Sequence, residues 1–121
     1  MKEYFFDTYA VIELIKGNPK FSRYNVVPII ITFLNLLEIA YITLLEQGEE
    51  KSKEIFLKFK EFVVDISDKT ILEAIQFRAK NKKMSLSYAD CLGYIFSKDN
   101  DLIFLTGDDA FKNMPNVEFL K

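Results

Sequence analysis

The sequence contains no histidine and no tryptophan, and Cys91 is its only cysteine. A disulfide within the chain is therefore excluded, and so is chemistry that needs a histidine base or several Cys and His ligands. Glycine and proline are also scarce, at four and three residues among 121, while half of the residues are hydrophobic. This composition excludes disorder and predicts one globular domain over residues 1–121. With no signal peptide at its start, we expect a cytoplasmic, reducing environment.

The chain has almost no net charge: 16 basic and 18 acidic residues leave a formal charge of −2. No overall positive field draws the chain to nucleic acid, which argues against a passive nucleic-acid-binding protein. A bound divalent cation would reverse the sign of an acidic pocket, so a nucleic-acid substrate stays compatible with this composition.

One long apolar run, residues 26–45, has the length of a membrane span. It contains Pro28 near its start and Asn35 and Glu38 near its middle. A central carboxylate costs about 2.5–3.5 kcal/mol in a bilayer. We therefore predict a buried strand followed by a buried helix, and no membrane association.

The apolar residues follow two periods that alternate along the chain. Short continuous runs predict buried strands, and spacings of three and four residues predict helices. Strands are expected at residues 2–6, 26–31, 63–66, 101–106 and 117–120, and helices at 8–16, 33–46, 49–62, 68–80, 87–97 and 109–114. Strands separated by helices indicate an α/β fold, a three-layer α/β/α sandwich with a mainly parallel central sheet.

Four acidic residues stand where a predicted strand ends or a predicted helix begins: Asp7, Glu38, Asp90 and Asp108. Ligands of parallel sheets bind beyond the carboxyl ends of the strands, so the four can meet at one edge. Clustered carboxylates are hard ligands for Mg²⁺ or Mn²⁺, the ions that assist phosphodiester hydrolysis. We therefore treat all four as candidate catalytic and metal-binding residues.

Each acid also has a simpler explanation. Asp7 and Asp108 are placed to cap a following helix, and Ser87 with Asp90 forms a capping-box pattern. Glu38 is the only charged residue between Arg23 and Glu46, and its helix is apolar on nearly every side. A carboxylate in that setting needs a partner, a site or exposure to water.

Four segments together resemble the PIN-domain family, and within it the VapC-type toxin ribonucleases, over almost the full length. The segments are FDT at residues 6–8, TFLNLLE at 32–38, LSYADCL at 86–92 and LTGDDAF at 105–111. The family often has a further acid directly before the last Phe, where this chain has Ala110, and Asp109 lies one position earlier. The position of a second metal ion is therefore open.

The resemblance implies a Mg²⁺- or Mn²⁺-dependent endoribonuclease with an RNA substrate, a homodimer, and a small antitoxin as partner. The alternatives are a PIN-type nuclease of RNA processing or decay, and an inactive PIN-like module that binds proteins. A phospho-acceptor receiver domain is a further α/β option, but Asp7 lacks the paired acid expected there. Aromatic or aliphatic residues would form the partner interfaces, and the candidates are Phe33, Tyr41, Phe56 and Phe59, although core packing is the default expectation for all four.

Several other polar residues are candidates for supporting roles. Thr106 can hydrogen-bond a ligand carboxylate, or can cap the turn that follows it. Asn35 lies one helical turn before Glu38, and can hold it or simply occupy a polar face. A basic cluster, for which RNA contact or favourable helix-end charge are both possible, comprises Arg78, Lys80, Lys82 and Lys83.

Overall fold

The computed structural model describes residues 2–121 and contains a three-stranded parallel sheet. Its strands are β1 (Tyr4–Phe6), β2 (Ile103–Thr106) and β3 (Val117–Phe119), in the order β1-β2-β3. In the register, Phe5 is paired with Phe104, and Phe104 with Val117. The predicted α/β fold with a parallel sheet is confirmed.

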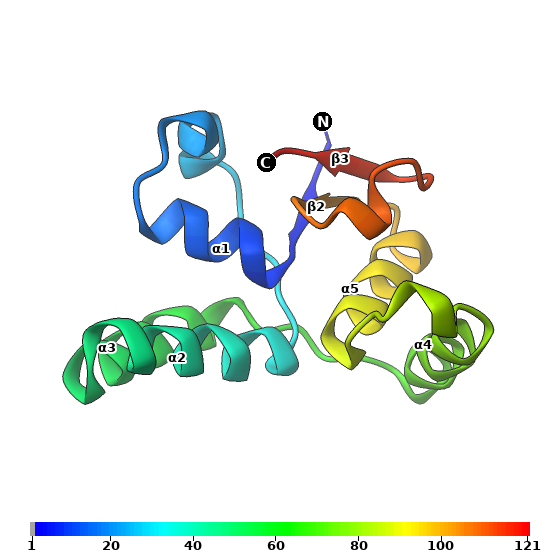
Figure 1. Cartoon of the computed structure of the whole chain (residues 1–121), viewed down its shortest axis with the longest axis horizontal. Coiled ribbons are helices and arrows are strands. Elements are labelled where there is room, and N and C mark those ends of the chain that lie inside the picture. The colour runs from blue at the N-terminus through cyan, green and yellow to red at the C-terminus, as the bar shows by residue number, and fades with distance from the viewer. Residues whose placement is uncertain (1) are drawn as a thin grey trace.

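The helices lie on the two sides of this small sheet, as Figure 1 shows. The α-helices are α1 (Thr8–Ile15), α2 (Phe33–Gln47), α3 (Glu49–Phe59), α4 (Asp68–Lys80) and α5 (Tyr88–Asp99). Short 3₁₀ helices lie in the connections: η1 (Pro19–Val26), η2 (Lys60–Phe62) and η3 (Lys82–Met84) between α-helices, and η4 (Asp109–Phe111) between β2 and β3. In residues 2–121, no helix has both the length and the apolarity that a membrane crossing requires.

Two hydrophobic cores lie on opposite faces of the sheet, because successive strand side chains point in opposite directions. Phe6 and Leu105 join a core with residues of α1, η1, α2 and α3. Phe5 and Phe104 join a second core with residues of α4 and α5. Gly93 lets α5 approach the sheet, since a Cβ there would lie 2.5 Å from the Phe5 ring. Two helical layers thus cover one sheet.

The predicted strands at 26–31 and 63–66 are wrong as regular strands. Only a single parallel bridge joins Ile31 to Val63. Pro28 has no N–H to donate to a ladder, and Val26 ends η1 with 87% of its side chain exposed. The segment still runs beside β1, since the Phe6 N–H donates to the Ile30 carbonyl at 3.0 Å. It is an extended connection rather than a strand.

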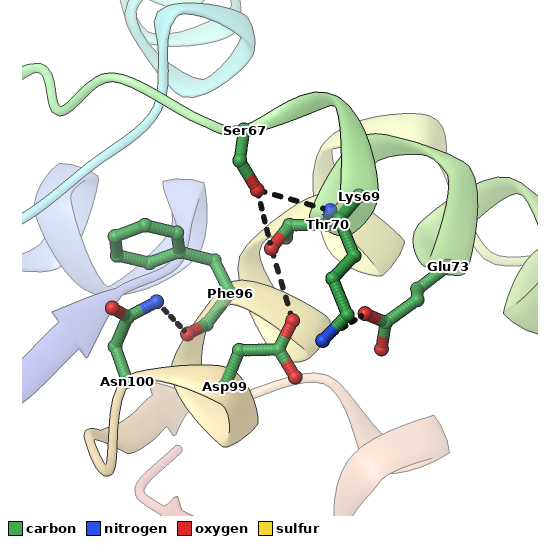
Figure 2. A network of polar contacts seen from close by, with 7 residues as sticks. All are labelled: Ser67, Lys69, Thr70, Glu73, Phe96, Asp99 and Asn100. Atoms are coloured by element: carbon green, nitrogen blue, oxygen red, sulfur yellow. Dashed lines mark hydrogen bonds and ion pairs between the residues drawn. The ribbon is translucent and has the colours of Figure 1, made fainter.

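A polar network joins α4 to α5 at the end far from the strand edge described below (Figure 2). Ser67 caps α4 by accepting the Thr70 N–H at 3.2 Å. The Thr70 hydroxyl then donates to the Asp99 carboxylate at 2.9 Å, and Asn100 donates to the Phe96 carbonyl at 2.9 Å. The Thr70–Asp99 bond joins the start of α4 to the end of α5, and the other two bonds cap these helix ends.

Candidate functional site

The first candidate acid, Asp7, directly follows β1 and caps α1. Its Oδ1 accepts the Ala10 N–H at 2.8 Å, and its Oδ2 accepts a hydrogen bond from the Thr106 hydroxyl. Only 4% of the residue is exposed. The pKa of Asp7 is raised to about 7, mainly by burial; the two hydrogen bonds lower it, and the charges of Asp90 and Asp108 add to the rise.

Thr106 connects Asp7 to Asp108, at the end of the adjacent strand. Its hydroxyl donates to Asp7 and accepts the Asp108 N–H at 3.0 Å. Asp108 caps η4 by accepting the Ala110 N–H at 2.9 Å. Gly107 is required between them, because a Cβ there would lie 2.3 Å from the Tyr9 ring. Because β1 and β2 are parallel, both acids lie at the same sheet edge, as the sequence predicts.

Glu38 reaches the same region from α2. The Thr8 hydroxyl donates to its Oε1, and the Asn35 side chain donates to the Thr8 oxygen at 3.1 Å. Asn35 therefore supports Glu38 through Thr8 rather than by direct contact. Burial raises the pKa of the half-buried Glu38, and the charge of Asp90 adds to this effect. The sequence alone assigns no role to Thr8, although Thr8 directly follows Asp7.

Asp90 occupies the first turn of α5 and forms the predicted capping box. Its Oδ2 accepts the Ser87 N–H at 3.0 Å, and its own N–H donates to the Ser87 hydroxyl at 3.0 Å. Burial raises the pKa of Asp90, the two bonds to Ser87 lower it, and Asp108 raises it again. Asp90 therefore both caps α5 and belongs to the acidic group.

The four carboxylates share one electrostatic environment. Asp90 raises the pKa of Asp7 and of Glu38, and Asp108 raises the pKa of Asp7 and of Asp90. In Figure 1, the N-terminal ends of α1, α2 and α5 face a common region beside the end of β1. The structure therefore brings together acids that are up to 101 positions apart, from Asp7 to Asp108.

The carboxylates do not form a finished coordination sphere. In the part of the chain that the structure describes, no three Asp, Glu or Cys side chains are arranged so that they could hold a metal ion. Each acid instead accepts a hydrogen bond from a nearby hydroxyl or N–H. In donor type the group suits Mg²⁺, which prefers oxygen and keeps several waters, so few direct ligands are needed. In charge it also suits a cation, which relieves the mutual repulsion.

Asp109 is exposed and is paired with a lysine. Its carboxylate pairs with the Lys121 ammonium at 2.9 Å, and 70% of the side chain is exposed. The hydrogen bond from Lys121 lowers the pKa of Asp109, in contrast to the other three shifted carboxylates. Asp109 therefore does not replace the acid that the family often has in place of Ala110.

Comparison with known families identifies the family to which the chain belongs. The family model described as "PIN domain" matches residues 4–117, nearly the whole chain. The chain belongs to the PIN domain family. The matched range includes all four candidate acids, and PIN domains are generally nucleases that typically use divalent metals. The sequence resemblance is confirmed at the level of the family.

Solved structures give the same fold. A toxin–antitoxin complex from Klebsiella pneumoniae matches with a TM-score of 0.72 and 17% identity, covering 96% of each chain. VapBC2 from Rickettsia felis, bound to a DNA fragment from its promoter, matches with a TM-score of 0.73 and 18% identity, covering 98% of each chain. Among curated proteins, none matches the sequence. At these identities the structural likeness establishes the fold alone.

Proposed function

We propose that this PIN domain is a Mg²⁺- or Mn²⁺-dependent endoribonuclease and the toxin of a toxin–antitoxin pair. The observation that carries the proposal is the convergence of four acids at one sheet edge, where the charges of Asp90 and Asp108 raise the pKa values of neighbouring carboxylates. Mutual repulsion is a cost to the folded protein. An inactive module that only binds proteins has no use for it.

Asp7, Glu38, Asp90 and Asp108 are the residues that would hold the ion. An ion held there would supply an acidified water as nucleophile and would neutralise charge on the phosphate oxygens. Thr106 orients Asp7, and Thr8 orients Glu38, through the hydrogen bonds described above. Asn35 holds Thr8 in turn. Such supporting bonds keep a ligand carboxylate in one orientation.

The exposed surface of α2 supports a protein partner, both as a second copy in a homodimer and as a small antitoxin. Four apolar residues lie on it at four-residue spacings: Phe33, Leu37, Tyr41 and Leu45, exposed by 55%, 46%, 61% and 67%. An apolar stripe of this kind on a soluble domain marks an interaction surface. Phe59, in contrast, is 3% exposed, and Phe56 packs against the core, so the structure assigns both to packing.

The test compares Glu38→Gln with Glu46→Gln, an exposed position on the same helix. Glutamine keeps an oxygen that can accept from the Thr8 hydroxyl, so Glu38→Gln removes charge with little structural change. We expect weaker Mn²⁺ binding by calorimetry and RNA cleavage reduced about 100-fold or more. Glu46→Gln should bind and cleave like the wild type, and EDTA should abolish cleavage in both.

Three outcomes would each contradict a different part of the proposal. Equal cleavage by the two variants removes Glu38 from the site, and cleavage that survives EDTA removes the metal. Cleavage without any antitoxin in co-purification from the native host favours the alternative, a PIN nuclease of RNA processing or decay.

A further inference from the structure

The basic cluster at the end of α4 has no part in the site described above. Between Glu73 and Asp90 the sequence holds four basic residues and no acidic one. All four basic side chains are exposed: Arg78, Lys80, Lys82 and Lys83. In a chain of net charge −2, this segment is a local concentration of positive charge.

Arg78 is held in place within this cluster. Its Nε donates to the Leu86 carbonyl at 2.9 Å. This bond does not use the two terminal nitrogens of the guanidinium. The guanidinium carbon lies 4.2 Å from the centre of the Tyr88 ring. Tyr88 is nevertheless 58% exposed. A fixed guanidinium and an open aromatic surface are therefore adjacent.

Two hollows adjoin this pair and share Arg78 and Lys82. One has a volume of about 120 Å³ and is also lined by Asn81, Ser85 and Leu86. The other has a volume of about 200 Å³ and is also lined by Ile75, Ala79 and Tyr88. The first offers hydrogen-bond donors and positive charge, which suit a phosphate. The second combines the same charge with an aromatic wall, which suits a base.

This region borders the acidic group. Tyr88 precedes Asp90 by two residues on α5, an axial rise of about 3 Å. Hydrogen bonds show the same proximity, because Arg78 donates to the Leu86 carbonyl and the next residue, Ser87, donates its N–H to Asp90 at 3.0 Å. A nucleic-acid strand that reaches the acids from this side would pass over Tyr88 and Arg78.

We propose that Arg78, Lys82 and Tyr88 form a binding site for a single-stranded stretch of RNA that flanks the cleaved bond. Arg78 and Lys82 bind a phosphate, and the Tyr88 ring stacks on an unpaired base. The inference rests on the proposed ribonuclease function and adds the path of the flanking RNA, which runs along the start of α5 toward η3. An exposed ring favours single strands, because duplex bases are not free to stack on it.

The experiment measures binding of a short, fluorescein-labelled single-stranded RNA by anisotropy, in EDTA so that no cleavage occurs. The double variant Lys82→Gln/Lys83→Gln is compared with Lys53→Gln/Lys58→Gln, a matched pair of exposed lysines on α3. We expect the first to bind about 5- to 10-fold more weakly, with the slope of log affinity against log salt reduced by about 0.7 for each lost phosphate contact. The α3 pair should bind like the wild type.

Variants of Tyr88 test the contribution of base stacking separately from that of charge. Tyr88→Ala should weaken binding about 5-fold or more, while Tyr88→Phe should retain it. The same variants are tested on double-stranded DNA of the same sequence, for which Tyr88 should have no effect. Thermal melting confirms that each variant is folded.

Several results would overturn the inference. These are no RNA binding by the wild type, equal binding by the two lysine pairs, or full binding by Tyr88→Ala. Loss of antitoxin binding in the Lys82→Gln/Lys83→Gln variant with RNA binding unchanged would assign this surface to a protein partner instead. Tyr88-dependent RNA binding in a protein that cleaves no RNA with Mg²⁺ would support the site and refute the ribonuclease. Failure of the RNA-binding site and failure of the proposed ribonuclease function therefore give different results.

Discussion

Helices α2 and α5 begin in the same way but with different chemistry. Each starts with a capping box, Thr32 with Asn35 on α2 and Ser87 with Asp90 on α5. The backbone N–H of the cap residue donates to the side chain three positions later at 2.9 Å in α2 and 3.0 Å in α5. That side chain is an amide on α2 and a carboxylate on α5. The local geometry is matched, and only the charge differs.

The difference shows that the capping box needs an acceptor but no charge. Asn35 meets the requirement with 1% of the residue exposed. A carboxylate gains about 0.3–1 kcal/mol from the helix dipole at such a position. Asp90, however, is partly buried beside other acids, and burial and Asp108 raise its pKa. Its charge is therefore better explained by the acidic group than by the helix end.

The largest expected effect comes from making the two boxes alike, with Asp90→Asn. Asparagine keeps the acceptor for the Ser87 N–H and removes the charge. RNA cleavage with Mg²⁺ should fall about 100-fold or more, while the free energy of unfolding should change by less than about 1 kcal/mol. Fluorogenic RNA cleavage and thermal melting measure the two quantities. Wild-type cleavage in a variant that melts earlier would reduce Asp90 to a capping residue.

The reciprocal change, Asn35→Asp, is the control for this comparison. It keeps the acceptor, but it places a carboxylate at a buried position and removes the donor to the Thr8 oxygen. We expect a loss of about 2 kcal/mol or more in stability. If Asn35→Asp melts like the wild type, the two helix ends tolerate charge equally and the comparison loses its force.

The next prediction concerns pH and Asp7, whose pKa rises from 3.8 to about 7 on folding. Between these values the folded state holds a proton that the unfolded state has lost. Raising the pH through this window therefore destabilises the metal-free protein, with a slope of up to about 1.4 kcal/mol per pH unit from this group. The raised pKa values of Glu38 and Asp90 act in the same direction.

Melting in EDTA from about pH 4 to pH 8 tests this, with Asp7→Asn as the comparison. The stability of Asp7→Asn minus that of the wild type should increase across the window, because asparagine does not ionise. Added Mn²⁺ should reduce the difference near pH 7, since the ion stabilises the charged carboxylate. A difference that stays constant with pH would show that Asp7 is already ionised at pH 4.

Helices were more predictable than strands in this chain, for a physical reason. The ends of α2 and α4 follow from Thr32, Ser67 and Gly48, whose capping or chain-breaking chemistry is local. A strand depends on partners that are distant in sequence. The run at 26–31 has strand composition, but Pro28 leaves it with one bridge to Val63. Composition alone does not distinguish an extended connection from a ladder.

The sequence predicts which acids lie at this edge, but not the directions in which their carboxylates point. The rule that sites lie at strand ends placed Asp7 and Asp108 at one edge, and this is confirmed. The Thr8–Glu38 hydrogen bond spans 30 positions and exists only because α1 packs against α2. The direction of each carboxylate oxygen depends on such contacts. These orientations decide whether the acids form a coordination sphere, so the roles of the four acids remain proposals.

The smallest effect should come from removing the cap while keeping the charge, with Ser87→Ala. The Asp90 N–H loses its hydroxyl acceptor, which stands at 3.0 Å, and α5 should lose about 1 kcal/mol of stability. Asp90 can still accept the backbone N–H of residue 87, so its carboxylate stays near the group. Most cleavage should therefore survive, and the melting temperature should fall by a few degrees. Thr32→Ala on α2 is the matched control, with a similar loss of its cap. If Ser87→Ala instead loses cleavage as severely as Asp90→Asn, the cap is what holds Asp90 in position, and charge and capping cannot be separated on α5.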